Sequence, residues 1–175
     1  MILGMSLSTF TLVHVFISLV GIGSGLLVLY GMLLARRFDG ATAIFLLSTV
    51  LTSLTGFLFP FEHLLPSHVL GLLSLVALAV AMTARYSRHM AGVWRSTYVV
   101  SGVLALYFNV FVLVVQIFRR VPSVNALAPT QKEPPFLIVQ LVVMAIFVVL
   151  GILAVKKFRF EAVAADSSRR SSKAA

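Results

Sequence analysis

Five long apolar segments follow one another along the chain, separated by short connections that hold most of the charged residues. The segments span residues 9–35, 41–59, 67–84, 96–118 and 135–155. An α-helix needs about 20 apolar residues to cross a hydrocarbon core of roughly 30 Å. Each segment reaches or nearly reaches that length, and 67–84 is the shortest. The pattern therefore predicts five membrane-spanning helices.

Apolar residues run continuously within each segment and do not alternate with polar ones. Only helices and closed β-barrels satisfy the backbone in lipid, and barrel strands alternate apolar and polar over about ten residues. We therefore predict an all-α, polytopic transmembrane bundle, with residues 1–155 forming one transmembrane helical domain. The composition agrees, because 60% of the residues are hydrophobic and the mean hydropathy is +1.07. Residues 156–175, rich in Ser, Ala, Arg and Lys, are predicted to be a disordered basic tail.

The distribution of Lys and Arg predicts the direction of insertion. If the N-terminus is outside, eleven basic residues lie inside and only Arg119, Arg120 and Lys132 lie outside. Basic residues favour the cytoplasmic side, so the expected topology is N-out/C-in with a cytoplasmic tail. Topology also accounts for the net charge of +9, and we expect no nucleic-acid partner. Size and composition favour a multi-pass protein of a bacterial inner membrane.

Some chemistry is excluded or disfavoured by the residue inventory. The chain has no cysteine, which excludes disulfides, thiolate metal sites and iron–sulfur clusters. No connection is long enough for a soluble catalytic domain, and no motif names a reaction. We therefore expect a protein that is not an enzyme and whose partners are the lipid bilayer and a second copy or a larger membrane complex.

Small and polar residues mark the inner face of several predicted helices. His14, Ser18, Gly21 and Gly25 share one face of the first segment. Gly21 and Gly25 form a small-xxx-small pair, which favours close packing against another helix. Asn109 and Gln116 share a face of the fourth segment, and Gln140 lies on the inner face of the fifth.

Polar residues concentrate toward one end of the predicted bundle. Six of them fall within the outer third of the membrane or its rim, given 1.5 Å of rise per residue: His14, Glu62, His63, His68, Gln116 and Gln140. The opposite half of the spans has no histidine. We interpret the six as a polar pocket that opens outward.

Four interpretations of that pocket stay open. His14 and His68 could ligate a b-type haem, or serve quinone chemistry, with Gln116 and Gln140 as further cofactor-binding residues. In architecture the chain resembles small bis-histidine membrane b cytochromes, although it lacks their usual pairing of ligands on each helix. Glu62, His63 and His68 could bind a divalent metal. The pocket could also serve a proton or small-solute permease.

The fourth interpretation is structural, and the sequence favours it. The Gln and Asn side chains would then hydrogen-bond across helices, and the protein would be an accessory or assembly component of the membrane. The identity of any cofactor stays unknown at this stage, with haem b and a divalent metal as the candidates.

Overall fold

The protein is an all-α bundle, as the sequence predicts. A computed structural model describes the backbone of residues 2, 4–59 and 66–174, and the side chains of these residues up to Phe158 except those of Pro66 and Ser67. Its helices are α1 (Leu7–Leu33), α2 (Asp39–Gly56), α3 (Pro66–Met82), the π-helical turn η1 (Thr83–Ser87), α4 (Val93–Arg120), the short α5 (Pro122–Asn125) and α6 (Pro134–Ala174).

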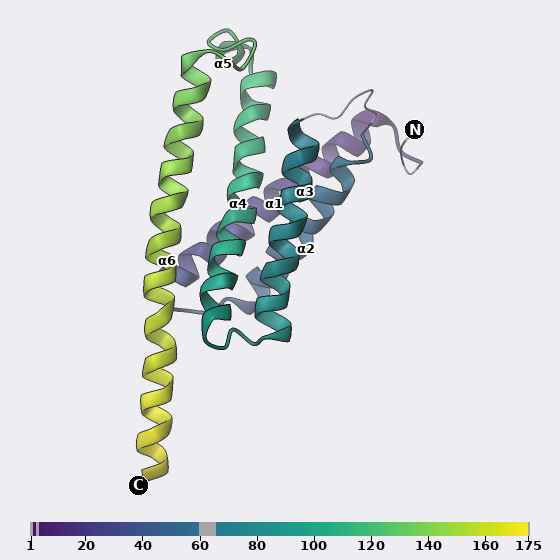
Figure 1. The fold of residues 1–175 in the computed structure, drawn as a ribbon. Helices are drawn as coiled ribbons and strands as arrows, with labels where there is room; N and C mark the ends of the chain where they lie inside the picture. Colours follow the sequence, from purple (N-terminus) through teal and green to yellow (C-terminus); the bar gives the residue numbers. More distant parts are fainter. Residues whose placement is uncertain (1, 3, 60–65, 175) are drawn as a thin grey trace.

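Five helices of the described chain are long and apolar enough to cross a membrane: α1, α2, α3 with η1, α4, and α6 from Pro134 to Phe158. The prediction of a multi-pass helical bundle is therefore confirmed. The two chain ends lie at opposite ends of the bundle (Figure 1). The direction of insertion, N-out/C-in, stays a prediction from the charge count.

Local sequence signals set several helix boundaries. The Ser6 hydroxyl caps α1 by accepting a hydrogen bond of 3.2 Å from the N–H of Thr9. α5 and α6 begin at Pro122 and Pro134, where the missing proline N–H has no partner to lose. Before α4 the chain turns through Gly92 at φ 55°, a left-handed conformation that glycine adopts at little cost.

α4 lies at the centre of the bundle and contacts every other long helix. α1 crosses obliquely behind α4 and reaches α6, while α3 packs along α4 (Figure 1). One apolar core draws buried residues from all five long helices, including Val28, Phe45, Leu78, Leu106 and Phe147. A second, smaller cluster joins α4 to α6 beneath α5. The main core therefore fixes the positions of α1 to α4, and α6 closes one side.

Three helices approach one another closely at the glycine face of α1. A methyl group added at Gly25 would lie 2.6 Å from Leu106 of α4 and 2.8 Å from the Phe45 ring of α2. A methyl group at Gly21 would lie 3.2 Å from the hydroxyls of Ser48 and Thr49. The small-xxx-small pair thus packs against other helices, as the sequence predicts.

α6 is the longest helix and continues beyond the rest of the bundle to Ala174 (Figure 1). The composition of residues 156–175 predicts a disordered tail, whereas the backbone is helical as far as Ala174. No Gly or Pro follows Gly151, and Ala, Lys, Arg and Glu favour helix, which accounts for the continuous helix.

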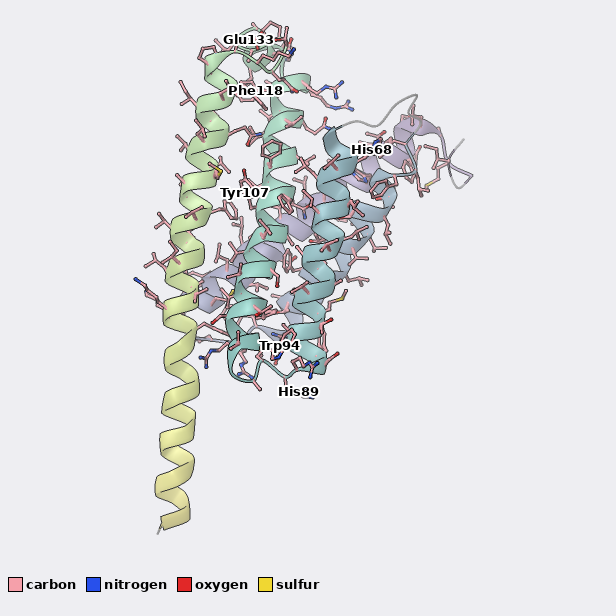
Figure 2. The ribbon with its side chains drawn as sticks, viewed as in Figure 1. His68, His89, Trp94, Tyr107, Phe118 and Glu133 are labelled. Carbon is pink, nitrogen blue, oxygen red and sulfur yellow. The ribbon has the colours of Figure 1, made fainter. Side chains whose placement is uncertain are left out.

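The bundle has two ends, which are named here by their elements. The α5 end carries α5, the start of α1 and the start of α3 (Figures 1 and 2). The η1 end carries η1, the connection from α1 to α2, and the loop before α4. In the predicted topology the α5 end is the outer end.

Candidate functional site

His14 ties α1 to α2 at the α5 end. Its Nδ1 lies 2.8 Å from the Thr55 hydroxyl, and its ring meets the Phe59 ring edge-on, with 5.1 Å between centroids. The Cε1 atom would lie 3.8 Å from a methyl group on Gly56. His14 therefore fills a space between two helices and is hydrogen-bonded there.

His68 lies on the other side of α2. It is 6% exposed, and its ring stacks on the Phe57 ring at a centroid distance of 5.6 Å. Thr55 and Phe57 are two residues apart, which is about 200° around a helix. Among the described residues α1 and α3 each pack on α2 and do not contact one another. His14 and His68 therefore contact α2 from different sides.

The two glutamines differ, because one contacts another helix and the other contacts its own. Gln140 of α6 donates from Nε2 to the Phe111 carbonyl of α4 at 3.2 Å. Gln116 accepts from Arg120 of its own helix at 3.4 Å. Glu62 and His63 lie outside the described residues, so the predicted metal set of Glu62, His63 and His68 stays untested. Within the described chain no group of three or more His, Asp or Glu side chains is placed to hold a metal ion.

A polar contact also lies in the middle of the bundle. Asn109 of α4 donates from Nδ2 to the Thr49 hydroxyl of α2 at 3.2 Å, and both side chains are buried. Gly21 of α1 leaves the space for this pair, because its missing side chain would point at the same atoms. The face predicted to hold Asn109 is therefore an interior face, and it joins three helices.

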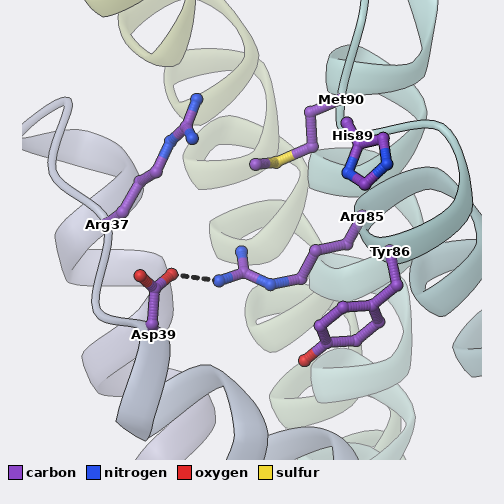
Figure 3. Close-up of a pocket in the computed structure, with 6 residues that line it drawn as sticks. All are labelled: Arg37, Asp39, Arg85, Tyr86, His89 and Met90. Atoms are coloured by element: carbon purple, nitrogen blue, oxygen red, sulfur yellow. Dashed lines mark hydrogen bonds and ion pairs between the residues drawn. The ribbon is translucent and has the colours of Figure 1, made fainter.

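The charged pocket of the protein lies at the η1 end, away from the residues that the sequence singled out. It has a volume of about 300 Å³ and is lined by Arg37, Asp39, Arg85, Tyr86, His89 and Met90. Arg37 and Asp39 form one side, and η1 with the loop after it forms the other (Figure 3). Two segments that are far apart in the sequence therefore meet around this hollow.

Arg85 is the central side chain of the pocket. It is only 9% exposed, and it pairs with Asp39, which is 78% exposed. Its Nη1 donates to the Tyr98 hydroxyl at 3.3 Å, and its guanidinium lies 5.3 Å from the Tyr98 ring and 5.7 Å from the Tyr86 ring. Burying a cation costs several kcal/mol unless it is paired. The carboxylate, the hydroxyl and the two aromatic faces offset that cost.

The backbone at the end of α3 is shaped to place Arg85. The N–H of Arg88 bonds to the carbonyl of Thr83 at 3.0 Å, a five-residue step that widens the helix into a π turn. His89 and Met90 then adopt positive φ angles of 46° and 55°, which is unfavourable for residues other than glycine. The Met90 N–H bonds back to Ala84, and Met90 is buried. This reversal places His89 and Met90 in the lining of the pocket.

Sequence reasoning missed this site because it assigned the basic residues of the η1 end to topology alone. One signal was available. Asp39 is the only acidic residue before Glu62, and it stands at a predicted span boundary beside a row of arginines. A single carboxylate in that setting indicates an ion pair, but its partner on another helix cannot be identified from one-dimensional spacing.

No family model, curated protein or solved structure matches the chain. Its function is therefore inferred from the geometry above.

Proposed function

We propose that the protein is a non-catalytic membrane component of accessory or assembly type, which binds another membrane protein through α6. The main support is that polar side chains inside the spans contact other helices of the same bundle. His14 contacts Thr55, Asn109 contacts Thr49, and Gln140 contacts the Phe111 carbonyl. Each contact joins two helices, and such contacts average about 0.6 kcal/mol. These residues hold the bundle together, which is the arrangement expected of a structural protein.

The burial of the helices supports α6 as the contact surface. Half of the most apolar window of α4 is buried, against 17% for α6. α6 lies at the side of the bundle and contacts only α1 and α4 among the long helices. Its exposed residues include Leu141, Val149 and Ile152. A partner helix can therefore pack along α6 without displacing any other helix of the bundle.

The haem, metal and permease hypotheses receive no comparable support from the described contacts. The two candidate haem ligands contact different sides of α2, and two of the three candidate metal ligands, Glu62 and His63, lie outside the described residues. An absorption spectrum of the purified protein tests the haem alternative. A Soret band that is lost in His14→Ala or His68→Ala would replace the accessory role with a redox role.

Site-specific photocrosslinking in the native membrane tests the proposed role. A photoreactive residue at Val149 on α6 should crosslink to one protein of defined mass, which also co-purifies at fixed stoichiometry in mild detergent. The matched control is Leu47 on α2, which is 63% exposed, against 55% for Val149. The control position should crosslink to lipid only. A monomeric protein with lipid adducts at both positions would refute the proposal.

A further inference from the structure

An open groove runs along the membrane-spanning part of the bundle between α3 and α4. It has a volume of about 530 Å³, and its lining includes Val76 and Ala77 of α3 and Val100, Ser101 and Leu104 of α4. Val76, Val100 and Leu104 are exposed, so the groove opens toward lipid. Among the described residues α6 packs on α4 and does not contact α3. An exposed strip of α4 therefore lies between α3 on one side and α6 on the other (Figure 1).

Tyr107 stands at the edge of this strip, next to α6. It lies about 60° around α4 from Leu104, and Figure 2 shows it near the middle of the helix. The side chain is half-buried. Its interactions with described residues are ring contacts with Phe108, Phe111 and Phe147, the last on α6 at 5.7 Å between centroids, and none is a hydrogen bond to its hydroxyl.

The depth of Tyr107 makes this unpartnered hydroxyl informative. Tyr107 lies near the midpoint of α4, about 20 Å from either end at 1.5 Å of rise per residue. The side chain is too short to reach the headgroups, where tyrosine is usually found in membrane proteins. A hydroxyl in hydrocarbon without a hydrogen bond is unfavourable. The molecule that occupies the adjoining groove is therefore expected to supply its partner.

A transmembrane helix fits this requirement better than a lipid or a second copy does. Lipids keep their polar groups in the interfacial regions, outside the hydrocarbon core. A second copy related by a two-fold axis would present the same surface, and two concave grooves cannot fill each other. A helix can carry an amide or hydroxyl side chain at its centre, and such side chains hydrogen-bond between membrane helices. Ala77 and Ser101 in the groove are small, which allows a helix to approach closely.

We infer that a transmembrane helix of a partner protein lies in the groove over α4, between α3 and α6, and that a polar side chain at its centre hydrogen-bonds to the Tyr107 hydroxyl. The inference rests on the proposed function, because this helix is the one that packs along α6. It adds the chemistry of the partner, which is an apolar span with one amide or hydroxyl side chain at the midplane of the bilayer.

Synthetic helices provide a direct test. One peptide is an apolar transmembrane helix of about 20 residues with a single central Gln, and its matched control has Leu at that position. Both carry a fluorophore, and energy transfer measures their binding to the full chain in dioleoylphosphatidylcholine vesicles. The wild type should bind the Gln peptide about threefold more tightly than the Leu peptide, as expected for one hydrogen bond between membrane helices.

Variants of the full chain locate the contact. Tyr107→Phe removes the hydroxyl and keeps the ring, so it should bind both peptides as the wild type binds the Leu peptide. Tyr30→Phe removes an exposed hydroxyl of α1 outside the groove, and it should keep the threefold preference. A photoreactive residue at Leu104 should crosslink to the Gln peptide. The matched control at Leu51 of α2, which is 39% exposed against 42% for Leu104, should crosslink to lipid only.

Each other result would overturn the inference. Equal or absent binding of the two peptides to the wild type would show that the groove does not recognise a polar group. A preference that persists in Tyr107→Phe would assign the recognition to another residue. Crosslinking from Leu104 to a second copy would make the groove an interface between copies. Displacement of the Gln peptide by decylubiquinone would assign the groove to a quinone.

The proposed function can survive the failure of this inference. In the native membrane, a photoreactive residue at Leu104 should crosslink to the same protein as one at Val149. Crosslinking from Val149 alone would refute the groove and leave the contact surface on α6 in place. Lipid adducts at both positions would refute the proposed function, whereas the peptide preference tests the Tyr107 hydroxyl in either case.

Discussion

The two ends of the bundle use polar side chains in different ways. At the α5 end, His14 is paired with Thr55, and His68 stacks on Phe57, on a different side of α2. At the η1 end, two segments of the chain bring Arg37, Asp39 and Arg85 around one hollow. The α5 end holds more of the polar residues that the sequence predicts to be functional, but among the described residues charged side chains line a common pocket at the η1 end. A candidate binding site is therefore recognised by polar side chains that line one pocket. Polar side chains that each contact a neighbouring helix separately, however many there are, only stabilise the bundle.

The largest expected effect is that of Asp39→Asn at the η1 end. It leaves the buried Arg85 cation without its carboxylate, and we expect a loss of about 2–3 kcal/mol, reduced because Asp39 is exposed and the pocket admits water. Thermal unfolding in detergent measures the loss. In the double variant Asp39→Asn/Arg85→Gln part of the stability should return, because the orphaned charge is gone. If Asp39→Asn lost no more stability than the surface variant Arg36→Gln, the ion pair at the η1 end would be no stronger than an exposed charge.

The next largest effect is a loss of stability in the apolar core, which lies between the two ends. Gly25→Ala places a methyl group 2.6 Å from Leu106 and 2.8 Å from Phe45, and such overpacking costs about 1–3 kcal/mol. Gly23→Ala is the control, two residues away on the same helix and in open space. It should be neutral or slightly stabilising, because alanine favours helix more than glycine does. Equal midpoints for the two variants would mean that α1 does not pack as described.

A smaller effect measures the tie at the α5 end. His14→Phe and Thr55→Val each remove one partner of the 2.8 Å contact while keeping most of the packing. The coupling energy from the double-mutant cycle should be about 0.6 kcal/mol, the average for hydrogen bonds between membrane helices. A coupling energy above that of the Asp39–Arg85 pair would reverse the comparison of the two ends.

The smallest effect is local to the connection before α6. Desolvation acts to raise the pKa of Glu133, but hydrogen bonds from the Thr130 hydroxyl and from the backbone N–H groups of Thr130 and Lys132 outweigh it and lower the pKa below 4.5. A lowered pKa stabilises the folded loop above pH 4.5, and this contribution is lost as the pH falls through the folded-state pKa.

Hydrogen exchange across residues 126–134, corrected for intrinsic rates, measures that effect. Protection should fall on acidification in the wild type, whereas in Glu133→Gln it should be low at every pH. The η1 end carries no part of this effect and serves as the internal control. A pH response of equal size in both proteins would assign the change to another group.

The amino-acid sequence by itself determined the membrane class, the helices and much of their packing. Apolar runs of spanning length leave no other structure in lipid, because every backbone group must be bonded internally. Helical spacing was enough to place Gly21, Gly25 and Asn109 on interior faces, since residues three and four apart share a face. These conclusions depend only on local geometry, which the sequence encodes directly.

Only the tertiary structure decided which polar residues meet. His14 and His68 have similar predicted depths, but α2 lies between them, and depth carries no information about the order of helices around a bundle. Asp39 and Arg85 are 46 residues apart, and the π turn that aims Arg85 has no marker in the sequence. The pair forms because helix packing removes water from the Arg85 guanidinium, and the carboxylate of Asp39, although exposed, then becomes its strongest partner.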